Sequence, residues 1–523
     1  MDNMDLKLNR ETFTGTQTIL DTSFEQSVEH NFVLPDYYPD IFRILKCFVM
    51  PCIISQSING NKLSYEISVN IKVLYLSEND NRINCLEQKL NFTKTADMTG
   101  VCTDPFVTIM PRCDYVNCRV VNQRRLDIRG AITSTVKVQG EVLTPVVVDA
   151  FGGNIQLKKQ PVTYPAKRLT ASKRVTVIDE LELAVSKPAV SSVIRSNCIV
   201  IPQEQKMIAG KLITKGNAEI SMLYTCVTAD GDDSVESMKF TLPFSQIIDV
   251  EGIDESFNAD VDISAVSCEI IPKGEDSKSL ECELVLLVNC EAIKYETCQI
   301  VTDAYSTCYE CEIKVIESRM KTVPIRVDEM QTVSDSVMCS DGPIGCIYDC
   351  WAEKENISTR YDEEKNCFIV TGNIKFCLLG KNENKVPFLA ETESPFEQEI
   401  HLDENCKTSS DMEFEHSVKI MNCSYYLADE NNVELKAEVN IGGKIIQQCA
   451  NAKTIINDIV IDTDKPKEKK GDYALKLCYC GTNDDIWEIA KKYSTSITAI
   501  MEENDLQDDK VTEKGMLLIP LMK

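Results

Sequence analysis

Cysteine and histidine are the side chains of this sequence with the widest range of chemistry. There are 24 cysteines and three histidines, His30, His401 and His416. A zinc site needs four well-placed ligands of these types. Three cysteine pairs are closely spaced: Cys308 with Cys311, Cys346 with Cys350, and Cys478 with Cys480. No second pair stands at a familiar spacing from any of them, so the sequence predicts neither a metal site nor a cofactor.

Many of the cysteines lie inside apolar stretches, as Cys377 does between Phe376 and Leu378. A free cysteine in such a setting behaves as a small buried hydrophobe. The first 30 residues contain no apolar core after a basic start, so no secretory signal is expected. We therefore interpret the cysteines as reduced thiols in a cytosol. The alternative is that some of them are cross-linked later in an insoluble assembly.

Catalytic and phosphate-binding motifs are missing from the sequence. No His-Glu-x-x-His, Gly-x-Ser-x-Gly or Gly-x-x-x-x-Gly-Lys-Ser/Thr segment occurs. The formal net charge of −27 disfavours nucleic acid, which requires a basic surface, and docking on anionic lipid. No apolar run approaches the roughly 18 residues of a membrane-spanning helix. The sequence predicts a protein that is not an enzyme, does not bind nucleic acid and does not insert into a membrane.

One pattern of residues occurs three times along the chain. A proline, an isoleucine and a cysteine each recur at intervals of 149 to 155 residues. The three sets are Pro39, Pro188 and Pro343; Ile71, Ile220 and Ile374; and Cys118, Cys268 and Cys423. Independent markers that keep one spacing indicate three tandem copies of a module of about 150 residues, a normal domain size.

Each copy has the pattern of antiparallel strands. Residues 63–75 alternate apolar and polar side chains, which places one face of a strand in a core and the other in water. A hairpin follows in residues 118–138, with counterparts in the other two copies. Two antiparallel sheets that each bury one face can pack together as a β-sandwich. The expected fold is mainly β, with three tandem antiparallel β-sandwich-like repeats of roughly eight strands each.

At most one short helix is expected in each copy, at its start. In the first copy, Pro39 suits a first helical turn, and Ile41, Ile44 and Leu45 fall on one helical face. The copies are assigned to residues 1–160, with an N-terminal segment, 161–311 and 312–461. Residues 158–172 and 305–315 are expected to be connectors, and the charged residues 462–472 an exposed linker.

The tail, residues 473–523, has a different pattern. Residues 473–480 alternate as a strand, and the polar residues 483–485 can cap the amphipathic helix that follows at 486–493. A second helix begins after Thr495 and Ser496, and residues 515–520 form a closing strand. The predicted order is β-α-α-β.

This tail resembles a LysM domain, whose motif reads Gly-Asp-Thr-Leu-Trp-x-Ile-Ala-x-x-Tyr, then Asn-x-Leu and Gly-x-x-Leu-x-Ile-Pro. The matching residues are Asp484, Ile486, Trp487, Ile489, Ala490, Tyr493, Asn504, Leu506, Gly515, Leu518, Ile519 and Pro520. LysM domains bind N-acetylglucosamine polymers in a shallow groove beside the first turn. Here Asn483 replaces the family's glycine, which asparagine tolerates because it also adopts a left-handed backbone. Asp485 replaces the usual threonine or serine, and residues 473–523 hold nine acidic residues against six lysines; both disfavour glycan binding.

The repeats in turn resemble the SPOCS domain of sporulation coat proteins, through the Leu-Pro and Pro-Asp-Ile residues at 34–41 and the strand that ends at 71–75. Three such domains and one LysM domain are the layout of the SipL family of spore-forming clostridia. The resemblance implies a role in spore coat assembly. It implies SpoIVA, the coat ATPase that polymerises on the forespore surface, as the partner, and the mother-cell cytoplasm as the location.

Partner binding is expected on the LysM strand and the turn that follows it. Because side chains alternate along a strand, Leu475, Leu477 and Tyr479 point to the face opposite Cys478 and Cys480. If nothing in the chain covers that face, it is an exposed apolar patch, which usually marks a partner surface. Trp487 is expected to be an anchor, since tryptophan is enriched among interface hot spots. The candidate partner-binding residues are Leu475, Leu477, Tyr479, Asp484, Asp485 and Trp487. The alternative is that these residues close the domain or dock on the third copy.

Three classes of function follow from these observations. The first is a non-enzymatic scaffold whose LysM tail docks on the SpoIVA-like coat ATPase, with other coat proteins as further partners. The second is a protein that holds peptidoglycan or chitin-type glycans in the LysM groove. The third is a hydrolase with an unrecognised site. The missing export signal disfavours the second class, and the missing nucleophile and base disfavour the third.

Overall fold

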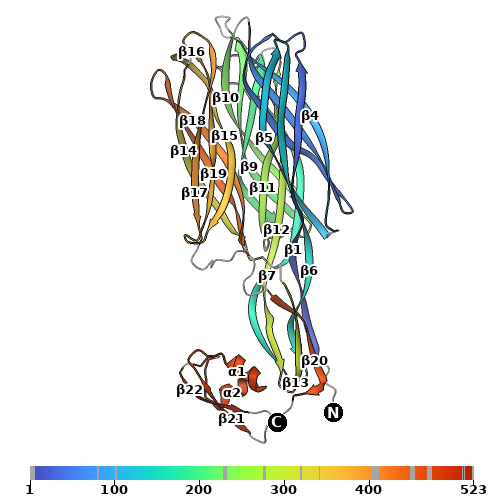
Figure 1. Cartoon of the computed structure of the whole chain (residues 1–523). Helices are drawn as coiled ribbons and strands as arrows, with labels where there is room; N and C mark the ends of the chain where they lie inside the picture. The colour runs from blue at the N-terminus through green and yellow to red at the C-terminus, as the bar shows by residue number, and fades with distance from the viewer. Residues whose placement is uncertain are drawn as a thin grey trace.

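The protein is built almost entirely of antiparallel strands, as the computed structural model in Figure 1 shows. The structure describes residues 6–78, 82–100, 103–227, 233–274, 278–317, 321–340, 342–402, 412–447, 454–467, 474–508, 510–511 and 513–520. Its two helices lie near the C-terminus. The predicted fold class, mainly β with a small βααβ tail, is confirmed.

The first copy consists of two three-stranded sheets. Its strands are β1 (Lys7–Val33), β2 (Ile41–Asn59), β3 (Lys62–Ser77), β4 (Ile83–Asp97), β5 (Thr103–Asn122) and β6 (Arg125–Phe151). The sheets have the orders β1-β6-β5 and β2-β3-β4. They share one core, to which β3 contributes Leu63 and Ile71 and β6 contributes Ile132. The alternation of residues 63–75 therefore marks the inner face of a sandwich, as predicted.

The second and third copies repeat this arrangement. The second comprises β7 (Ile155–Glu182), β8 (Ser192–Ile208), β9 (Lys211–Val227), β10 (Asp233–Asp249), β11 (Asn258–Lys273) and β12 (Ser279–Ser306). The third comprises β13 (Tyr309–Glu317), β14 (Ile325–Met338), β15 (Ile344–Asp362), β16 (Cys367–Asn382), β17 (Pro387–His401), β18 (Met412–Leu427), β19 (Asn432–Gln447) and β20 (Thr454–Pro466). The sheets β11-β12-β7 and β14-β19-β18 correspond to β1-β6-β5 of the first copy. Six strands, not eight, make the first and second copies.

The short helix expected at Pro39 is absent from the described residues, because β2 begins at Ile41. Residues 35–38 form a turn whose carbonyl oxygens accept hydrogen bonds from the Arg124 guanidinium, at 2.8 Å for Pro35 and 3.2 Å for Tyr38. β-Bulges then interrupt β2 after Ile41 and again before Lys46. A bulge adds one residue and shifts the alternation. The helix-like spacing of the apolar residues is the result of these two bulges.

The backbone at the repeated proline makes the same contact in the first two copies. The hydroxyl group of Tyr75 donates a hydrogen bond to the carbonyl oxygen of Pro39 at 3.0 Å. Tyr224 makes the same bond to Pro188 at 3.2 Å. Buried hydroxyl groups usually have a hydrogen-bond partner, and in these two copies the carbonyl oxygen of the repeated proline is that partner.

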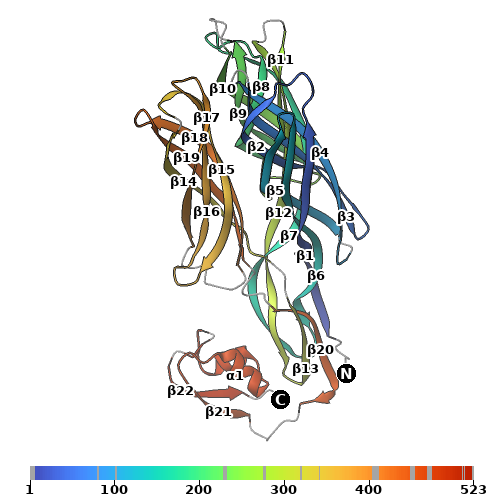
Figure 2. The ribbon, with the colours of Figure 1, turned by 45° about the horizontal axis from the view of Figure 1, so that its top comes forward.

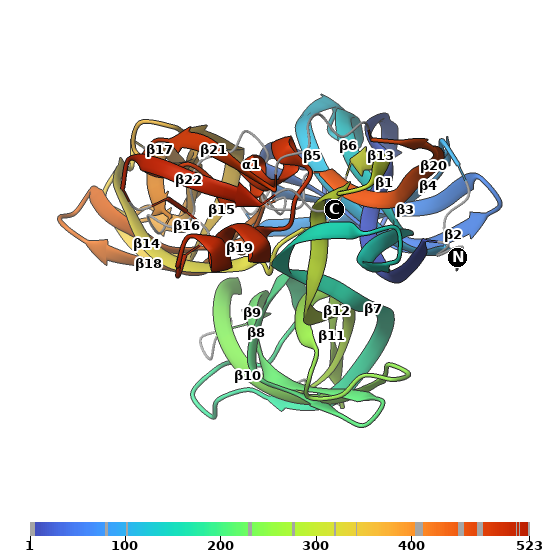
Figure 3. The same ribbon diagram turned by 90° about the horizontal axis from the view of Figure 1, so that it is seen from below.

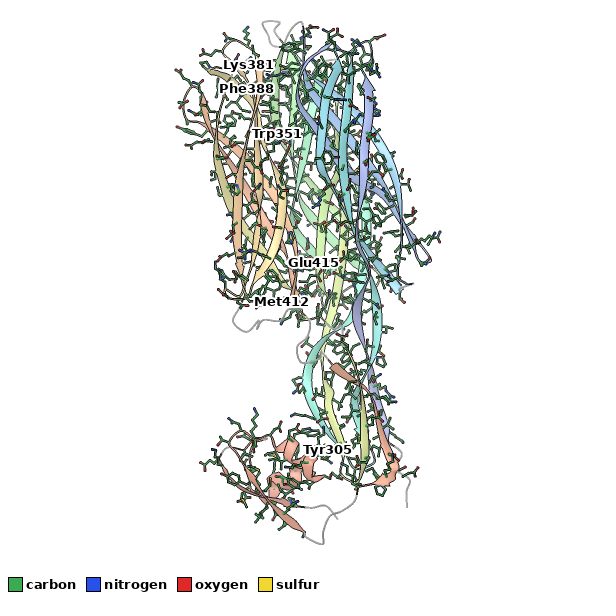
Figure 4. All side chains as sticks on the ribbon, viewed as in Figure 1. Tyr305, Trp351, Lys381, Phe388, Met412 and Glu415 are labelled. Atoms are coloured by element: carbon green, nitrogen blue, oxygen red, sulfur yellow. The ribbon has the colours of Figure 1, made fainter. Side chains whose placement is uncertain are left out.

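The three sandwiches surround a common axis, as the view from below in Figure 3 shows. Equivalent positions of the three copies meet there: Leu74, Leu223 and Cys377 belong to one buried apolar cluster. Trp351, labelled in Figure 4, packs in this cluster, and the Arg195 guanidinium of the second copy lies 4.7 Å from its ring centroid. The contacts between copies are therefore apolar at the centre and include a cation on an aromatic face.

Below the sandwiches the long strands continue as a narrower stalk, visible in Figures 1 and 2. We define the stalk as residues 7–15, 142–151, 155–167, 294–306, 309–317 and 454–466, one antiparallel strand pair from each copy. Its buried residues form two clusters: Phe13, Val146, Val162, Tyr164, Ile300 and Ile455, and then Val147, Ala150, Val301, Ala304, Ile456 and Ile459. Every cluster takes residues from all three copies.

The stalk changes the boundaries expected between copies. The second copy begins with β7 at Ile155 and the third with β13 at Tyr309, so residues 158–172 and 305–315 lie mostly within strands. Residues 462–466, expected to open a linker, are the end of β20, in which Pro466 pairs with Tyr309. Residues 468–472 of that predicted linker lie outside the described residues.

Ile300 tests whether the stalk is a shared core. Its side chain is fully buried among residues of the other two copies. We expect Ile300→Ala to lower the free energy of unfolding in urea by about 3 kcal/mol, because a buried isoleucine loses its contacts and leaves a cavity. Ile178→Ala on the same sheet, where the isoleucine is 64% exposed, is expected to change it by less than about 0.5 kcal/mol. Equal effects of the two substitutions would contradict a packed stalk.

Candidate functional site

The tail folds into the order predicted for it. Its elements are β21 (Leu475–Cys480), α1 (Ile486–Tyr493), α2 (Ile497–Glu503) and β22 (Gly515–Pro520). The Asp485 side chain caps α1 by accepting a hydrogen bond from the Trp487 backbone N–H at 2.8 Å. Asn483 has a left-handed backbone with φ of 69°, the conformation that glycine takes in the LysM motif and that asparagine tolerates.

The two-stranded sheet of the tail has one covered face and one open face. Cys480 and, from the opposite strand, Leu517 and Ile519 are buried under the helices. The open face presents apolar side chains, which are exposed by 43% in Leu475, 59% in Leu477, 70% in Tyr479 and 57% in Met516. We call these four residues the open LysM face. The predicted direction of Leu475, Leu477 and Tyr479 is confirmed, and Met516, opposite Tyr479 in register, joins them.

Trp487 lies on the other side of the tail and is buried against the stalk. Its ring packs edge-on against Tyr305 of β12, with 5.0 Å between ring centroids. Its indole N–H donates a 2.6 Å hydrogen bond to the Asp303 carboxylate, which also accepts from the Lys491 ammonium at 2.7 Å. Figure 4 labels Tyr305 at this end of the stalk, beside the tail. Trp487 thus anchors the tail within the chain.

The acidic residues of the turn are also engaged within the chain. Asp484 accepts a hydrogen bond from the Gly481 N–H at 2.7 Å. Asp485 forms an ion pair with Lys158 of β7 at 2.7 Å. Burial opposes the charge of Asp485, but Lys158 and the Trp487 N–H outweigh it and hold the pKa of Asp485 below its ordinary value. Asp485 therefore carries its negative charge at neutral pH, where it attracts Lys158.

The tail occupies one of three equivalent positions on the stalk. Asp149, Asp303 and Asp458 each follow a β-bulge at the same place in their strand pairs. Asp149 pairs with Lys159 at 2.8 Å, and Asp458 pairs with Arg10 at 2.8 Å. Only Asp303 receives its cation from the tail. The three aspartates are alike in backbone position and differ in the partner that reaches them.

The six predicted site residues do not form one surface. Leu475, Leu477 and Tyr479 lie together on the open LysM face, whereas Asp485 and Trp487 contact the stalk. Trp487 was expected to be exposed as an anchor for a partner; it is 2% exposed and buried against the stalk, and its binding of a partner stays a prediction. Sequence reasoning missed Asp303, Tyr305 and Lys158. The recurrence of an aspartate at 149, 303 and 458, the spacing of the repeat, was the one signal in the sequence for Asp303.

Among the described residues, none of the three cysteine pairs noted in the sequence belongs to a group of three or more possible metal ligands. The Cys478 and Cys480 sulfur atoms are 3.8 Å apart, and the Tyr493 hydroxyl is 3.6 Å from Cys478. The Cys308 sulfur contacts the Asn154 amide nitrogen at 2.9 Å. Over the described residues, neither group has a histidine or carboxylate that completes a ligand set. No helix in the described part of the chain is long and apolar enough to cross a membrane.

Comparison with known proteins identifies two kinds of domain. The family model described as SipL, SPOCS domain matches residues 40–121 and 189–271, and the LysM domain model matches residues 481–520. No curated protein and no solved structure matches the chain. The predicted resemblance to SPOCS and LysM domains is confirmed. Both are non-catalytic domain families, and together they indicate a sporulation protein that carries a LysM module.

Asp303 is expected to hold the tail on the stalk. In Asp303→Asn the carboxylate that receives Trp487 and Lys491 loses its charge, so both contacts weaken. In a Trp351→Phe background, Trp487 is the one remaining tryptophan of the two in the chain. We expect its fluorescence to shift to the red and its quenching by acrylamide to increase.

Asp149→Asn is the matched control, since Asp149 has the same position in the first copy and does not touch the tail. It is expected to leave the emission and the quenching of Trp487 unchanged. A response of equal size in both variants, or in neither, would show that Asp303 is not the anchor.

Proposed function

We propose that this protein is a non-catalytic scaffold of spore coat assembly that binds a SpoIVA-like coat ATPase through the open LysM face. On this proposal it works in the mother-cell cytoplasm, at the forespore surface, and helps to bring the coat around the forespore. The three sandwiches and the stalk form the body from which the LysM domain projects. The SPOCS and LysM matches support the setting in sporulation.

The observation that carries the proposal is the exposure of four apolar side chains on one small sheet. Leu477, Tyr479 and Met516 are each more than half exposed, and Leu475 continues the row. Adjacent exposed apolar residues are costly in water and usually mark a binding surface. A tyrosine and a methionine among them are residue types enriched in interface cores. Because the helices face the stalk, this sheet is the side of the tail directed toward a partner.

Glycan binding is the weaker candidate for the same domain. The groove used by LysM domains lies beside the turn at residues 483–485, where Asp485 is paired with Lys158 and Trp487 is buried. A sugar polymer in that groove would compete with contacts inside the chain. The open LysM face has no such competitor among the described residues.

Binding of the full-length protein to a purified SpoIVA-type ATPase tests this function. We expect Leu477→Arg and Tyr479→Arg each to weaken the affinity at least about 30-fold, because a charge replaces an apolar contact at the centre of the interface. Both side chains point into water, so circular dichroism should be unchanged. Val185→Arg, at an apolar residue of the second copy that is 95% exposed, is the control and should bind like the parent protein.

The same titrations with chitin oligomers distinguish the alternative. ATPase binding that is insensitive to both arginine variants would remove the open LysM face as the binding surface. Tight binding of chitin oligomers without binding of the ATPase would favour the glycan-binding function instead.

A further inference from the structure

A group of polar side chains gathers at the lower end of the third copy in the view of Figure 1, the end toward the LysM domain. In the sheet β15-β16-β17, Asp362 is opposite Cys367, and Cys367 is opposite His401. Residues opposite each other in a sheet project to the same face, as do residues two apart on one strand. Glu399 therefore joins the row from β17. The group lies at the end of β16 opposite to Lys381, which Figure 4 labels near the top of the molecule.

Three of these side chains converge on one point. The Cys367 sulfur, a Glu399 carboxylate oxygen and a His401 ring nitrogen all lie within 4.8 Å of one another. One pair, His401 Nε2 and Glu399 Oε2, is 3.4 Å apart. Two ligand atoms on one tetrahedral zinc ion are about 3.3–3.6 Å apart, given the usual Zn–N, Zn–O and Zn–S distances. The histidine and glutamate atoms are already at this separation, and the Cys367 sulfur lies within 4.8 Å of both.

The carboxylate is held in the required direction by a neighbour. The Lys365 ammonium pairs with Oε1 of Glu399, which leaves Oε2 directed toward His401. Partners of this kind orient metal ligands in known sites. Asp362 adds negative charge nearby, while its Oδ1 accepts the backbone N–H groups of Glu364 and Lys365 and closes the turn. Asp362 thus stabilises the turn that positions Cys367.

We propose that Cys367, Glu399 and His401 bind a zinc ion, with water in the fourth position. Thiolate, imidazole and carboxylate are the three ligand types that zinc takes in proteins. On binding, the Cys367 thiol becomes a thiolate, its proton passes to solvent, and no electron is transferred. The ion would tie the end of β17 to the start of β16.

A cysteine–histidine–glutamate group also suggests a nucleophile with its base, but the thiol here does not suit that role. The Cys367 side chain is completely covered, so its sulfur is out of reach of a substrate. His401 is 66% exposed at its side chain and contacts Glu399. A metal ion can still reach the three side chains from solvent, because the exposed His401 ring forms the solvent-facing side of the group.

Binding of Zn²⁺ and Co²⁺ to the reduced full-length protein tests the site. We expect one tight Zn²⁺ per chain by calorimetry, and with Co²⁺ a near-ultraviolet thiolate-to-cobalt absorption band. Cys367→Ala is expected to abolish this band, and His401→Ala to weaken zinc binding at least tenfold. The exposed His401 makes the second variant safe for folding. Cys346→Ala, which removes an exposed thiol of the same copy, is the control and should keep both signals.

The cobalt band and the zinc affinity together show whether Cys367 and His401 bind the metal. A cobalt–thiolate band that persists in Cys367→Ala would assign the metal to other thiols and overturn the proposal. The same holds if the parent protein gives no band, or if His401→Ala binds zinc as tightly as the parent.

Discussion

The shared core of the stalk is the contact on which the rest of the molecule depends. A single strand pair cannot cover both of its faces, and an isolated two-stranded ribbon is marginally stable in water. Here three pairs, one from each copy, bury Val146, Ile300 and Ile455 against one another. The three sandwiches are consequently held side by side, and the apolar cluster around Leu74 at their common axis completes the assembly.

The threefold repetition ends where the tail attaches. Asp149, Asp303 and Asp458 are equivalent in the backbone, yet their cations differ: Asp149 pairs with β7, Asp303 with the LysM helix α1, and Asp458 with β1 and β13. The tail reaches only Asp303, where Tyr305 offers an aromatic surface to Trp487. This attachment orients the LysM helices toward the stalk and leaves the open LysM face in water. The proposed function therefore rests on an asymmetry within a repeated structure.

Much of the fold could be predicted because the burial of one face of a strand or helix gives the sequence a regular spacing of apolar residues. The alternation in residues 63–75, the hairpins after the repeated cysteines and the βααβ tail all follow from which side chains face a core. The helix expected at Pro39 was wrong because two bulges in β2 gave apolar residues a helical spacing. The stalk escaped notice because its strands continue those of the sandwiches, so that no change of pattern marks where one core ends and the other begins.

For the candidate site, the sequence by itself determined which residues of the tail share a face, since a strand alternates whatever surrounds it. Leu475, Leu477 and Tyr479 needed no tertiary information. Whether each face is covered was decided only by the tertiary structure. Trp487 and Asp485 meet Asp303 and Lys158 across more than 180 residues of chain, and Cys367 meets His401 through strand pairing. Contacts of this kind depend on how the copies pack, which local periodicity does not encode.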